Sequence, residues 1–586
     1  MTKAPDAMGQ DDIEAFGSDL HPVIKKIYLG RGVRDDSEIA LRLADLEKPA
    51  SLRNIDQAVQ LLTRALQAQS RILIIGDFDA DGATSTALAM LSLKTMGFTQ
   101  VDFLVPNRFD YGYGLTPEIV DVASTLEPDV IITVDNGISS HEGVERAHHH
   151  GIQVLVTDHH LPGEDLPKAD CIVNPNQADC AFPSKALAGV GVVFYLMSAL
   201  RASLRQQGWF ARQQLAEPNM ATFLDIVALG TVADVVPLDA NNRRLVKHGL
   251  NIIRGGRGRP GILALLEVAG KSPQNVVAGD LGFAAGPRLN AAGRLDDMSL
   301  GIACLLADDE ATARSIALQL DGLNKDRKSI EMDMQAQALA VLDGISLDAG
   351  HGQLGICLYD AQWHQGVIGI LASRIKDRFH RPVIIFADGG TDTQDDGPIK
   401  GSARSIAGLH IRDLLDRIAT RHPALLQKFG GHAMAAGLTI RHADFDAFCQ
   451  AYQQALADVL DKTLLEPQLI TDGSLDASCF SIEFAQLLRD AGPWGQGFAE
   501  PRFQGAFRVI SQRLLAEKHL KLVLALPQTG EVIDAIAFNV SAQDWQAPVS
   551  EVALVYRLEL NEFRGTVSPQ LLIEKITVLE PGKRRA

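Results

Sequence analysis

The stretch "ILIIGDFDADGATS", Ile72–Ser85, decides the fold and raises the question of function. Four apolar residues in succession lead through one glycine into Asp77, Asp79 and Asp81. A continuous apolar run is typical of a strand that is buried on both faces of a parallel sheet. Carboxylates this close together are ionised near neutral pH and repel one another unless a positive charge lies among them. The stretch therefore predicts a strand end that binds a metal ion.

Four further runs have the same character. They are VDFLVPN at 101–107, DVIITVD at 129–135, IQVLVTD at 152–158 and CIVNPN at 171–176. Each ends in Asp or Asn, and in open α/β sheets the carboxyl ends of the strands form the crevice that binds ligands. We therefore expect the acidic strand ends, Asp77, Asp135 and Asp158, to converge at one edge of a parallel sheet.

Other interpretations of DFDADGATS fit less well. An EF-hand loop has a bidentate Glu at its twelfth position, which is Leu88 here, and it follows a helix rather than a strand. A phosphatase with an Asp nucleophile uses the pattern D-x-D-x-[T/V], but the last position here is Asp81. Carboxylates also cap helices, and DGATSTALAM opens a helix well, although one Asp is enough for capping. A metal-assisted site remains.

Two more segments contribute metal-binding residue types. His159 and His160 stand in VTDHHLPGEDLP, directly behind a predicted buried strand, and imidazole suits first-row metals. Asp225 and Asp234 interrupt the apolar segment DIVALGTVADVVPL. A carboxylate in so apolar a run needs a buried partner, and we expect Asp234 to have one.

Composition limits the class of protein. A chain of 586 residues is too long for one core and predicts about three domains. The net charge of −17 argues against coating of nucleic acid by bulk charge, although it leaves room for a local basic channel. Six cysteines without a CxxC pair, and an N-terminus without a signal pattern, indicate the cytoplasm. The apolar stretch AGVGVVFYLMSAL is too short for a membrane span.

The order of elements predicts an α/β protein with a β-rich C-terminal part. After Pro467 the chain becomes strand-rich, which predicts a small β-barrel or sandwich. Apolar residues at helical spacing among charges predict a long helical connector before a second α/β unit. The predicted parts are an N-terminal extension at 1–50, an α/β domain at 51–297, the connector at 298–345, the second α/β domain at 346–465 and the β-rich domain at 466–586.

The motifs together resemble a known family. GDFDADGATS, VDNG, TDHH and GTVADVVPL, in this order, resemble the four motifs of the DHH phosphoesterase superfamily. PNRFDYGYGL, GPRLNAAGRL, WHQGVIGILASR, KGSARS, FGGHAMAAGL and GPWGQGFAEPRF resemble the RecJ family of bacterial single-strand-specific 5′→3′ exonucleases. The resemblance implies a DHH domain with a parallel sheet, a DHH-associated domain joined to it by a long helix, and a C-terminal OB-like barrel.

The resemblance also implies a metal centre with two Mn²⁺ or Mg²⁺ ions. Asp77 and Asp79 would serve one ion, Asp81, His159 and Asp234 the other, and Asp135 would bridge them. His160 would lie near the scissile phosphate and stabilise charge there. Two ions clamp the attacking and leaving oxygens of a phosphodiester, and mixed carboxylate and imidazole ligands suit these metals.

Further residues are predicted to hold the DNA strand. Arginine forks and a hydroxyl match phosphate oxygens, and aromatic rings stack on exposed bases. Arg108, Ser402 and Arg404 are predicted to form a pocket for a 5′ phosphate that blocks a continuing chain. The basic stretch 241–261 is a candidate track for the phosphate backbone. The full predicted set of DNA-contacting residues is Arg108, Tyr111, Tyr113, Arg288, Ser402, Arg404, His432, Arg508 and Arg513.

These observations predict an exonuclease that releases mononucleotides from the 5′ end of single-stranded DNA in repair and recombination. One alternative is a phosphodiesterase of the same superfamily that cleaves short oligonucleotides or cyclic dinucleotides. The other is a replication scaffold that keeps the fold without catalysis. The resemblance implies single-strand-binding protein and a helicase as partners, and we expect a monomer without membrane association.

Overall fold

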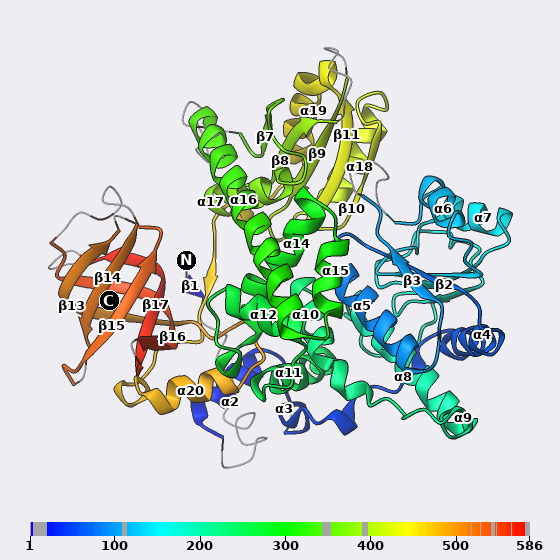
Figure 1. Ribbon diagram of the computed structural model, residues 1–586. Coiled ribbons are helices and arrows are strands. Elements are labelled where there is room, and N and C mark those ends of the chain that lie inside the picture. Colours follow the sequence, from blue (N-terminus) through cyan, green and yellow to red (C-terminus); the bar gives the residue numbers. More distant parts are fainter. Residues whose placement is uncertain are drawn as a thin grey trace. The chain divides into compact units, whose positions relative to one another are not determined.

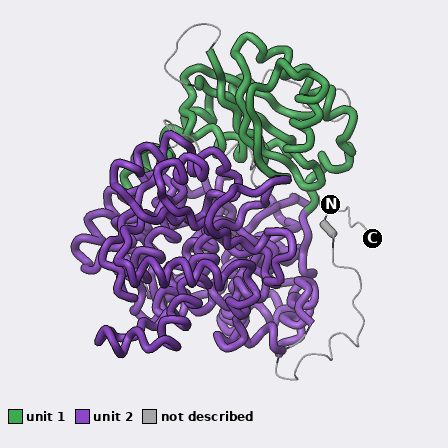
Figure 2. Tube along the Cα trace, turned by 90° about the vertical axis from the view of Figure 1, so that its right-hand side faces the viewer, with its two compact units in different colours: residues 1, 294–296, 321–468 green, residues 2–293, 297–320, 469–586 purple. Residues whose placement is uncertain are grey.

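The computed structural model describes residues 2–3, 20–34, 36–107, 114–342, 353–389, 397–516, 518–527, 529–540, 545, 548–563 and 565–579. It forms two compact units, coloured separately in Figure 2. The smaller unit comprises 294–296 and 321–468, and the larger one comprises nearly all of the remaining chain. None of the described helices is long and apolar enough to cross a membrane.

The larger unit contains the predicted parallel sheet (Figure 1). Its strands are β2 (Ile72–Gly76), β3 (Val101–Leu104), β4 (Val130–Val134), β5 (Gln153–Thr157) and β6 (Cys171–Val173). They pair in the order β3-β2-β4-β5-β6, and every pair is parallel. All five residues of β2 and of β4 are buried, which explains why these strands are apolar without alternation.

Helices cover both faces of this sheet. They are α4 (Ile55–Ala68), α5 (Ala80–Thr95), α6 (Pro117–Ser124), α7 (His141–His149) and α8 (Gly189–Gln206). Leu73 and Ile75 of β2 share a core cluster with Ile119 of α6 and Val144 of α7. Helices α5 and α8 contact strands of the same sheet and also contact each other. Because side chains of a strand alternate in direction, Ile72 and Ile74 face away from the cluster around α6 and α7.

A helical layer follows the sheet in the chain. Its main helices are α10 (Leu224–Ala233), α11 (Ala240–Arg254), α12 (Pro260–Val268), α14 (Gly286–Leu295), α15 (Ser299–Leu306) and the long α16 (Glu310–Leu342). Helix α10 contacts both α5 and α8, so it packs against the helices that cover the sheet. Helix α15 also contacts α5. Helices α10 and α15 of this layer therefore pack against α5.

The smaller unit is a second α/β domain. Its strands are β7 (Ile356–Tyr359), β8 (Val383–Asp388), β9 (Pro398–Arg404), β10 (Lys428–Gly431) and β11 (Ala435–Arg441), in the order β10-β11-β9-β8-β7. Only β7 and β8 pair in parallel among these described strands. The helices are α17 (Ile368–Phe379), α18 (Ile411–Arg421) and α19 (Phe445–Val459). Phe386, Phe448 and Tyr452 lie in its buried core.

The C-terminal part is a closed five-stranded barrel. Its strands β13 (Phe503–Leu515), β14 (His519–Ala525), β15 (Val532–Phe538), β16 (Glu551–Phe563) and β17 (Thr566–Val578) close in the order β13-β14-β15-β17-β16. Helix α20 (Ile482–Asp490) packs on β16 and β17. Phe503 and Phe507 of β13 are buried, so both rings belong to the core rather than to an exposed surface that could stack on bases. The predicted fold class, two α/β domains joined by a long helix and followed by a barrel, is confirmed.

Candidate metal centre

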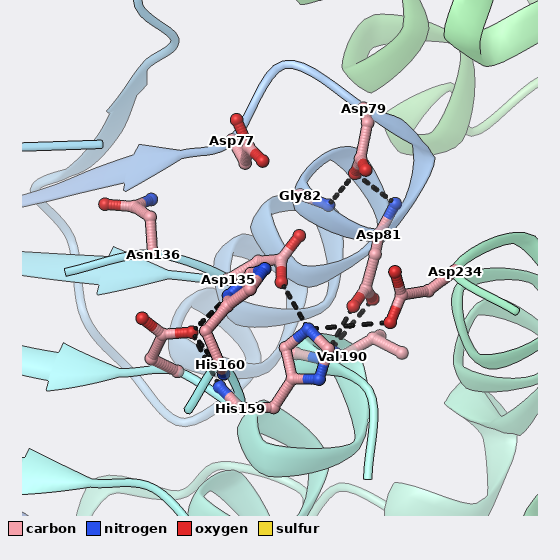
Figure 3. Close-up of polar contacts among 12 residues, drawn as sticks. Asp77, Asp79, Asp81, Gly82, Asp135, Asn136, His159, His160, Val190 and Asp234 are labelled. Carbon is pink, nitrogen blue, oxygen red and sulfur yellow. Dashed lines mark hydrogen bonds and ion pairs between the residues drawn. The ribbon is translucent and has the colours of Figure 1, made fainter. Parts of the chain in front are cut away.

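The order of the strands explains where the acidic residues meet. Strand β2 pairs with β3 on one side and with β4 on the other, so the order in which the chain adds strands to the sheet reverses between β2 and β4. Such a switch point leaves a crevice at the carboxyl ends of the two strands. Asp77 directly follows β2 and Asp135 directly follows β4. Figure 3 shows both side chains at this edge, together with Asp81 and Asp234.

The loop after β2 turns at once into helix α5. Asp79 is the N-cap residue, and its Oδ1 accepts hydrogen bonds from the amides of Asp81 at 2.9 Å and Gly82 at 3.0 Å. This is the capping role considered above, and it belongs to one carboxylate of the three. Asp81 instead accepts bonds from the amides of Gly189 at 2.6 Å and Val190 at 3.0 Å. These amides open helix α8, whose positive end favours a carboxylate.

Asp135 sits in a constrained loop. Its φ of 63° is unusual for a residue other than glycine, and strain of this kind clusters at functional sites. The side-chain amide of the buried Asn136 donates to the carbonyls of Ile75 at 3.1 Å and Val134 at 2.9 Å, which ties the ends of β2 and β4 together. A Cβ at Gly189 would lie 2.7 Å from the Cβ of Asp135. Only glycine at the start of α8 therefore allows this approach.

The histidine pair is organised by a buried aspartate. Asp158 is 1% exposed, and its carboxylate accepts bonds from the amides of Ile138, His159 and His160. Its Oδ1 also lies 2.7 Å from Nδ1 of His160. The ring of His159 points the other way, with Nε2 at 3.1 Å from Oδ1 of Asp135 and 3.5 Å from Oδ2 of Asp234 (Figure 3).

The acidic groups fit a bound cation by their chemistry. Burial and the neighbouring carboxylates raise the pKa of Asp135 and of Asp234 well above the ordinary value. Burial, together with the charge of Asp79, raises the pKa of Asp81 to about 7. The hydrogen bonds from the amides of α8 lower this pKa and offset only part of the rise. Carboxylates that are buried together cannot all ionise without a positive charge among them. Divalent metal ions supply that charge and prefer these oxygen and imidazole ligands.

Three groups of three side chains could each hold a metal ion, because within each group the ligand atoms lie within 4.8 Å of one another. The groups are Asp77, Asp79 and Asp135; Asp81, His159 and Asp234; and Asp135, His159 and His160. Asp135 and His159 each belong to two groups. Neighbouring positions for two ions that share one carboxylate are therefore compatible with the side-chain arrangement.

His160 differs from His159 in its electrostatics. Burial alone would lower the pKa of His160, but the hydrogen bond and charge of Asp158, together with Asp77 and Asp79, raise the pKa to about 9. Burial raises the pKa of Asp158, but the contacts with His160 lower it by more, so the net shift is downward. The pair is thus a buried carboxylate with a cationic imidazole at neutral pH in the absence of metal.

Helix α14 contributes residues that sequence reasoning passed over. Oδ1 of Asn290 accepts a hydrogen bond from the amide of Ala80 at 2.8 Å, inside the aspartate loop. A Cβ at Gly293 would lie 1.8 Å from the carbonyl oxygen of Phe78, so α14 packs directly on this loop. Just before α14, Phe283 lies in a π-helical turn, Leu281–Ala285, and is 89% exposed. The motif GPRLNAAGRL was the available signal, but its contacts come from distant segments of the chain.

The other predicted site residues lie in three places. Arg288 of α14 donates to the carbonyl of Ala284 at 2.7 Å. Ser402 and Arg404 lie on β9 of the smaller unit, where Nη1 of Arg404 donates to Oγ of Ser402 at 3.1 Å. His432 is exposed between β10 and β11. Arg508 and Arg513 are exposed on β13 of the barrel, and Arg108, Tyr111 and Tyr113 lie outside the described residues.

The predicted basic track at 241–261 needs a correction. Most of this segment is helix α11, and Arg243 and Arg244 in its first turns are buried at 4% and 9% exposure. Arg243 stacks over the ring of Phe498 at 4.1 Å, and burial lowers its pKa. Of the six basic residues of the segment only Arg257 is exposed, so the segment is a packed helix rather than a solvated track.

Comparisons with known proteins agree with this architecture. Residues 71–231 match the model of the DHH family, N-terminal domain, residues 352–458 match the DHHA1 domain, and residues 471–575 match the RecJ OB domain. The fold and the acidic cluster thus define a phosphoesterase of the DHH class.

Curated relatives narrow the class. The chain is 55% identical over 95% of its length to the single-stranded-DNA-specific exonuclease RecJ of Dickeya dadantii, and 52% identical over 97% to that of Escherichia coli, covering 96% and 97% of those proteins. The chain belongs to the RecJ family. It also resembles the crystal structure of RecJ from Thermus thermophilus in complex with Mn²⁺, with a TM-score of 0.79 and 28% identity, covering 99% of this chain and 79% of that one.

Proposed function

We propose that this protein is a single-stranded-DNA-specific exonuclease that hydrolyses phosphodiester bonds from the 5′ end and releases mononucleotides, with a role in DNA repair and recombination. The observation that supports it most strongly is the set of overlapping ligand groups at the switch point of the sheet, in a chain of the RecJ family. Divalent ions bound there, Mn²⁺ or Mg²⁺, lower the pKa of water and neutralise charge on the reacting phosphate.

The side chains hold this centre by a division of roles. Asp77 and Asp79 would hold one ion, and Asp81, His159 and Asp234 would hold the other, as the grouping of their atoms supports. Asp135 would serve both ions, since its carboxylate groups with Asp77 and Asp79 and also with His159, which belongs to the set proposed for the second ion. The amides of α8 and the cap of α5 fix Asp81 and Asp79, so these carboxylates need little reorganisation when metal binds.

His160 lies next to the proposed ligands. Burial lowers the pKa of its imidazole, and the hydrogen bond and charge of Asp158 raise it, which favours the cationic form. Asp158 fixes the orientation of its ring through Nδ1, and Nε2 is the atom that we assign to a substrate oxygen. A cationic imidazole there stabilises the charge that develops on the phosphate as the bond breaks. Because Asp158 is itself held by three backbone amides, the pair is rigid before substrate binds.

Binding of the strand uses residues outside the centre. Phe283 is exposed on the turn that packs against the end of α10, and we assign it base stacking, with Arg288 contacting phosphate. Ser402 and Arg404 receive the 5′ phosphate, which their side-chain pairing beside Gly369 at the start of α17 supports.

Arg108, Tyr111, Tyr113 and His432 remain proposed contacts with the strand, on the chemistry of their side chains. Arg508 and Arg513 of the barrel contact the phosphate backbone farther along the strand, since both are exposed.

The division of the chain at residues 50, 297, 345 and 465 is likewise part of the proposal. So are a cytoplasmic location, a monomeric state, and single-strand-binding protein and a helicase as partners.

A substrate comparison tests the proposed function. Degradation of single-stranded DNA is expected with Mn²⁺ or Mg²⁺ and is expected to stop when a chelator removes the metal. A cyclic dinucleotide or a short oligonucleotide cleaved faster than polymeric DNA would favour the small-substrate alternative. Retained DNA binding without cleavage of any of these substrates would favour the scaffold.

A further inference from the structure

We infer that the tight turn Gly495–Phe498, which leads into the C-terminal barrel, is a positioning element for the metal centre through Asp234. The inference rests on the proposed function in one respect, the assignment of Asp234 as a metal ligand. The turn lies within the residues that match the RecJ OB domain, yet it packs on the segment that follows Asp234. A part of the barrel region thereby sets the affinity for metal.

The segment after Asp234 is short and strained. Asp234 caps the end of α10, and Val235 then adopts a φ of 61°, which is a costly conformation for a β-branched residue. Such a conformation persists only where surrounding contacts hold it. Only Val235 and Val236 separate Asp234 from Pro237, so a displacement at Pro237 reaches the carboxylate directly.

Two backbone contacts hold the far end of this segment. The side-chain amide of Asn242 donates to the carbonyl of Pro237 at 2.9 Å, and the amide of Leu238 donates to the carbonyl of Gln496 at 2.7 Å. The first contact comes from helix α11 of the same domain. The second comes from the turn before the barrel, and it is the shorter of the two.

The turn itself is built to fit against Pro237 and Leu238. Gly495 and Phe498 close it with two mutual backbone hydrogen bonds, at 2.9 and 3.1 Å. A Cβ at Gly495 would lie 2.7 Å from Cδ1 of Leu238. Gly497 has a φ of 70°, and a Cβ there would lie 3.2 Å from Cβ of Pro237. The absence of side chains at both glycines is therefore what lets the backbone of the turn approach the segment.

Aromatic packing anchors the turn on the other side. Phe498 is 2% exposed, stacks on Trp494 at 5.1 Å between ring centroids, and carries the guanidinium of Arg243 at 4.1 Å. Arg243 belongs to α11, the helix that also holds Pro237 through Asn242. The turn and α11 thus contact each other, and both contact the segment after Asp234. Supports of this kind affect the affinity for metal because they orient the ligand.

The test compares two substitutions with the same backbone cost. Gly497→Ala introduces a side chain at a φ of 70° against Pro237, whereas Gly530→Ala, in the turn between β14 and β15, introduces one at a φ of 72° with nothing within 4 Å. Mn²⁺ alone is titrated into each full-length protein and free Mn²⁺ is followed by electron paramagnetic resonance. Gly497→Ala is expected to weaken the binding of one ion about tenfold, and Gly530→Ala to leave it unchanged.

A kinetic readout separates positioning from general damage. For Gly497→Ala the Mn²⁺ concentration for half-maximal nuclease activity is expected to rise while the rate at saturating Mn²⁺ is retained. Equal weakening in both glycine variants, or unchanged Mn²⁺ binding in Gly497→Ala, would overturn the inference. If Gly497→Ala does not fold, Phe498→Leu decides: a smaller loss of Mn²⁺ affinity is expected, and wild-type affinity would overturn the inference.

Asp234→Asn serves as the reference. Unchanged Mn²⁺ binding in that variant would refute the ligand assignment and hence that part of the proposed function. Weakened binding in Asp234→Asn with normal binding in Gly497→Ala would refute the inference alone.

Discussion

Neutralising Asp135 is expected to stabilise the metal-free protein although it disables the metal-loaded one. A carboxyl whose pKa is raised on folding holds its proton more tightly in the folded state. The free energy of unfolding therefore decreases as the pH rises from the unfolded pKa to the folded pKa, and it does not recover above the folded pKa. Asp81 has a pKa of about 7, compared with an ordinary value of 3.8, so its ionisation lowers the free energy of unfolding of the protein between about pH 4 and pH 7.

The structure sets the size of the effect. One pKa unit corresponds to about 1.4 kcal/mol, so the shift of Asp81 corresponds to about 4 kcal/mol of folding free energy at pH 8. Asp135 is buried in the same cluster, and its pKa is raised by the same causes. We therefore expect Asp135→Asn to raise the free energy of unfolding of the metal-free protein at pH 8, because the amide removes a buried carboxylate that must otherwise ionise beside its neighbours. The melting temperature of the metal-free protein is expected to rise accordingly.

Calorimetry in the presence of a chelator, at pH 5 and pH 8, measures this effect. The difference between Asp135→Asn and wild type is expected to be smaller at pH 5 than at pH 8, and to be reversed when Mn²⁺ is added, because only the wild type gains from binding. Asp121→Asn is the control: Asp121 is a surface carboxylate whose pKa is lowered by Arg146 and His150, so its loss is not stabilising. A metal-free Asp135→Asn protein no more stable than wild type at pH 8 would refute the electrostatic reasoning.

Substitutions at three further places test the proposed path of the strand. Arg404→Ala is expected to impair degradation of 5′-phosphorylated strands more than of 5′-hydroxyl strands, by about 1.5–3 kcal/mol, and equal losses on strands labelled at the 3′ end would assign Arg404 a structural role. Replacing Arg508 and Arg513 with Ala is expected to lower the salt dependence of strand binding by about 0.7 in the log–log slope for each lost contact; an unchanged slope would remove them from the path. Phe283→Ala is expected to weaken strand binding by about 1–3 kcal/mol with Mn²⁺ binding intact, and wild-type affinity in a fluorescence titration would exclude stacking.

The sequence predicted the sheet well because burial on both faces leaves a direct mark. Strand β2 is apolar at every position before its glycine, and Asp77, which is itself buried, follows the last residue of the strand. Parallel strands deliver their carboxyl ends to one edge, so the meeting of Asp77 with Asp135 followed from topology alone. The same topological argument places Asp158 at this edge of the sheet. Its contacts with the histidines could not be predicted from the sequence.

The remaining features depend on contacts between distant segments. Asn290 reaches the aspartate loop across 210 residues of chain, and the amide of Gly189 reaches Asp81 across 108. No local pattern encodes such distances. The prediction of a basic track at 241–261 was wrong for a related reason. A run of basic residues shows the local charge of the segment, but it does not show which distant residues bury those side chains. Arg243 is buried by Phe498, a residue from the far end of the chain.

The most direct test of the account measures bound metal and cleavage together in the wild type and in Asp135→Ala. The wild type is expected to bind two Mn²⁺ ions per chain and to release mononucleotides from 5′-phosphorylated single-stranded DNA. Asp135→Ala is expected to lose both the ions and the activity while its circular dichroism spectrum stays unchanged, because a bridging carboxylate serves both ions. Substantial cleavage by Asp135→Ala with its metal retained would contradict the account.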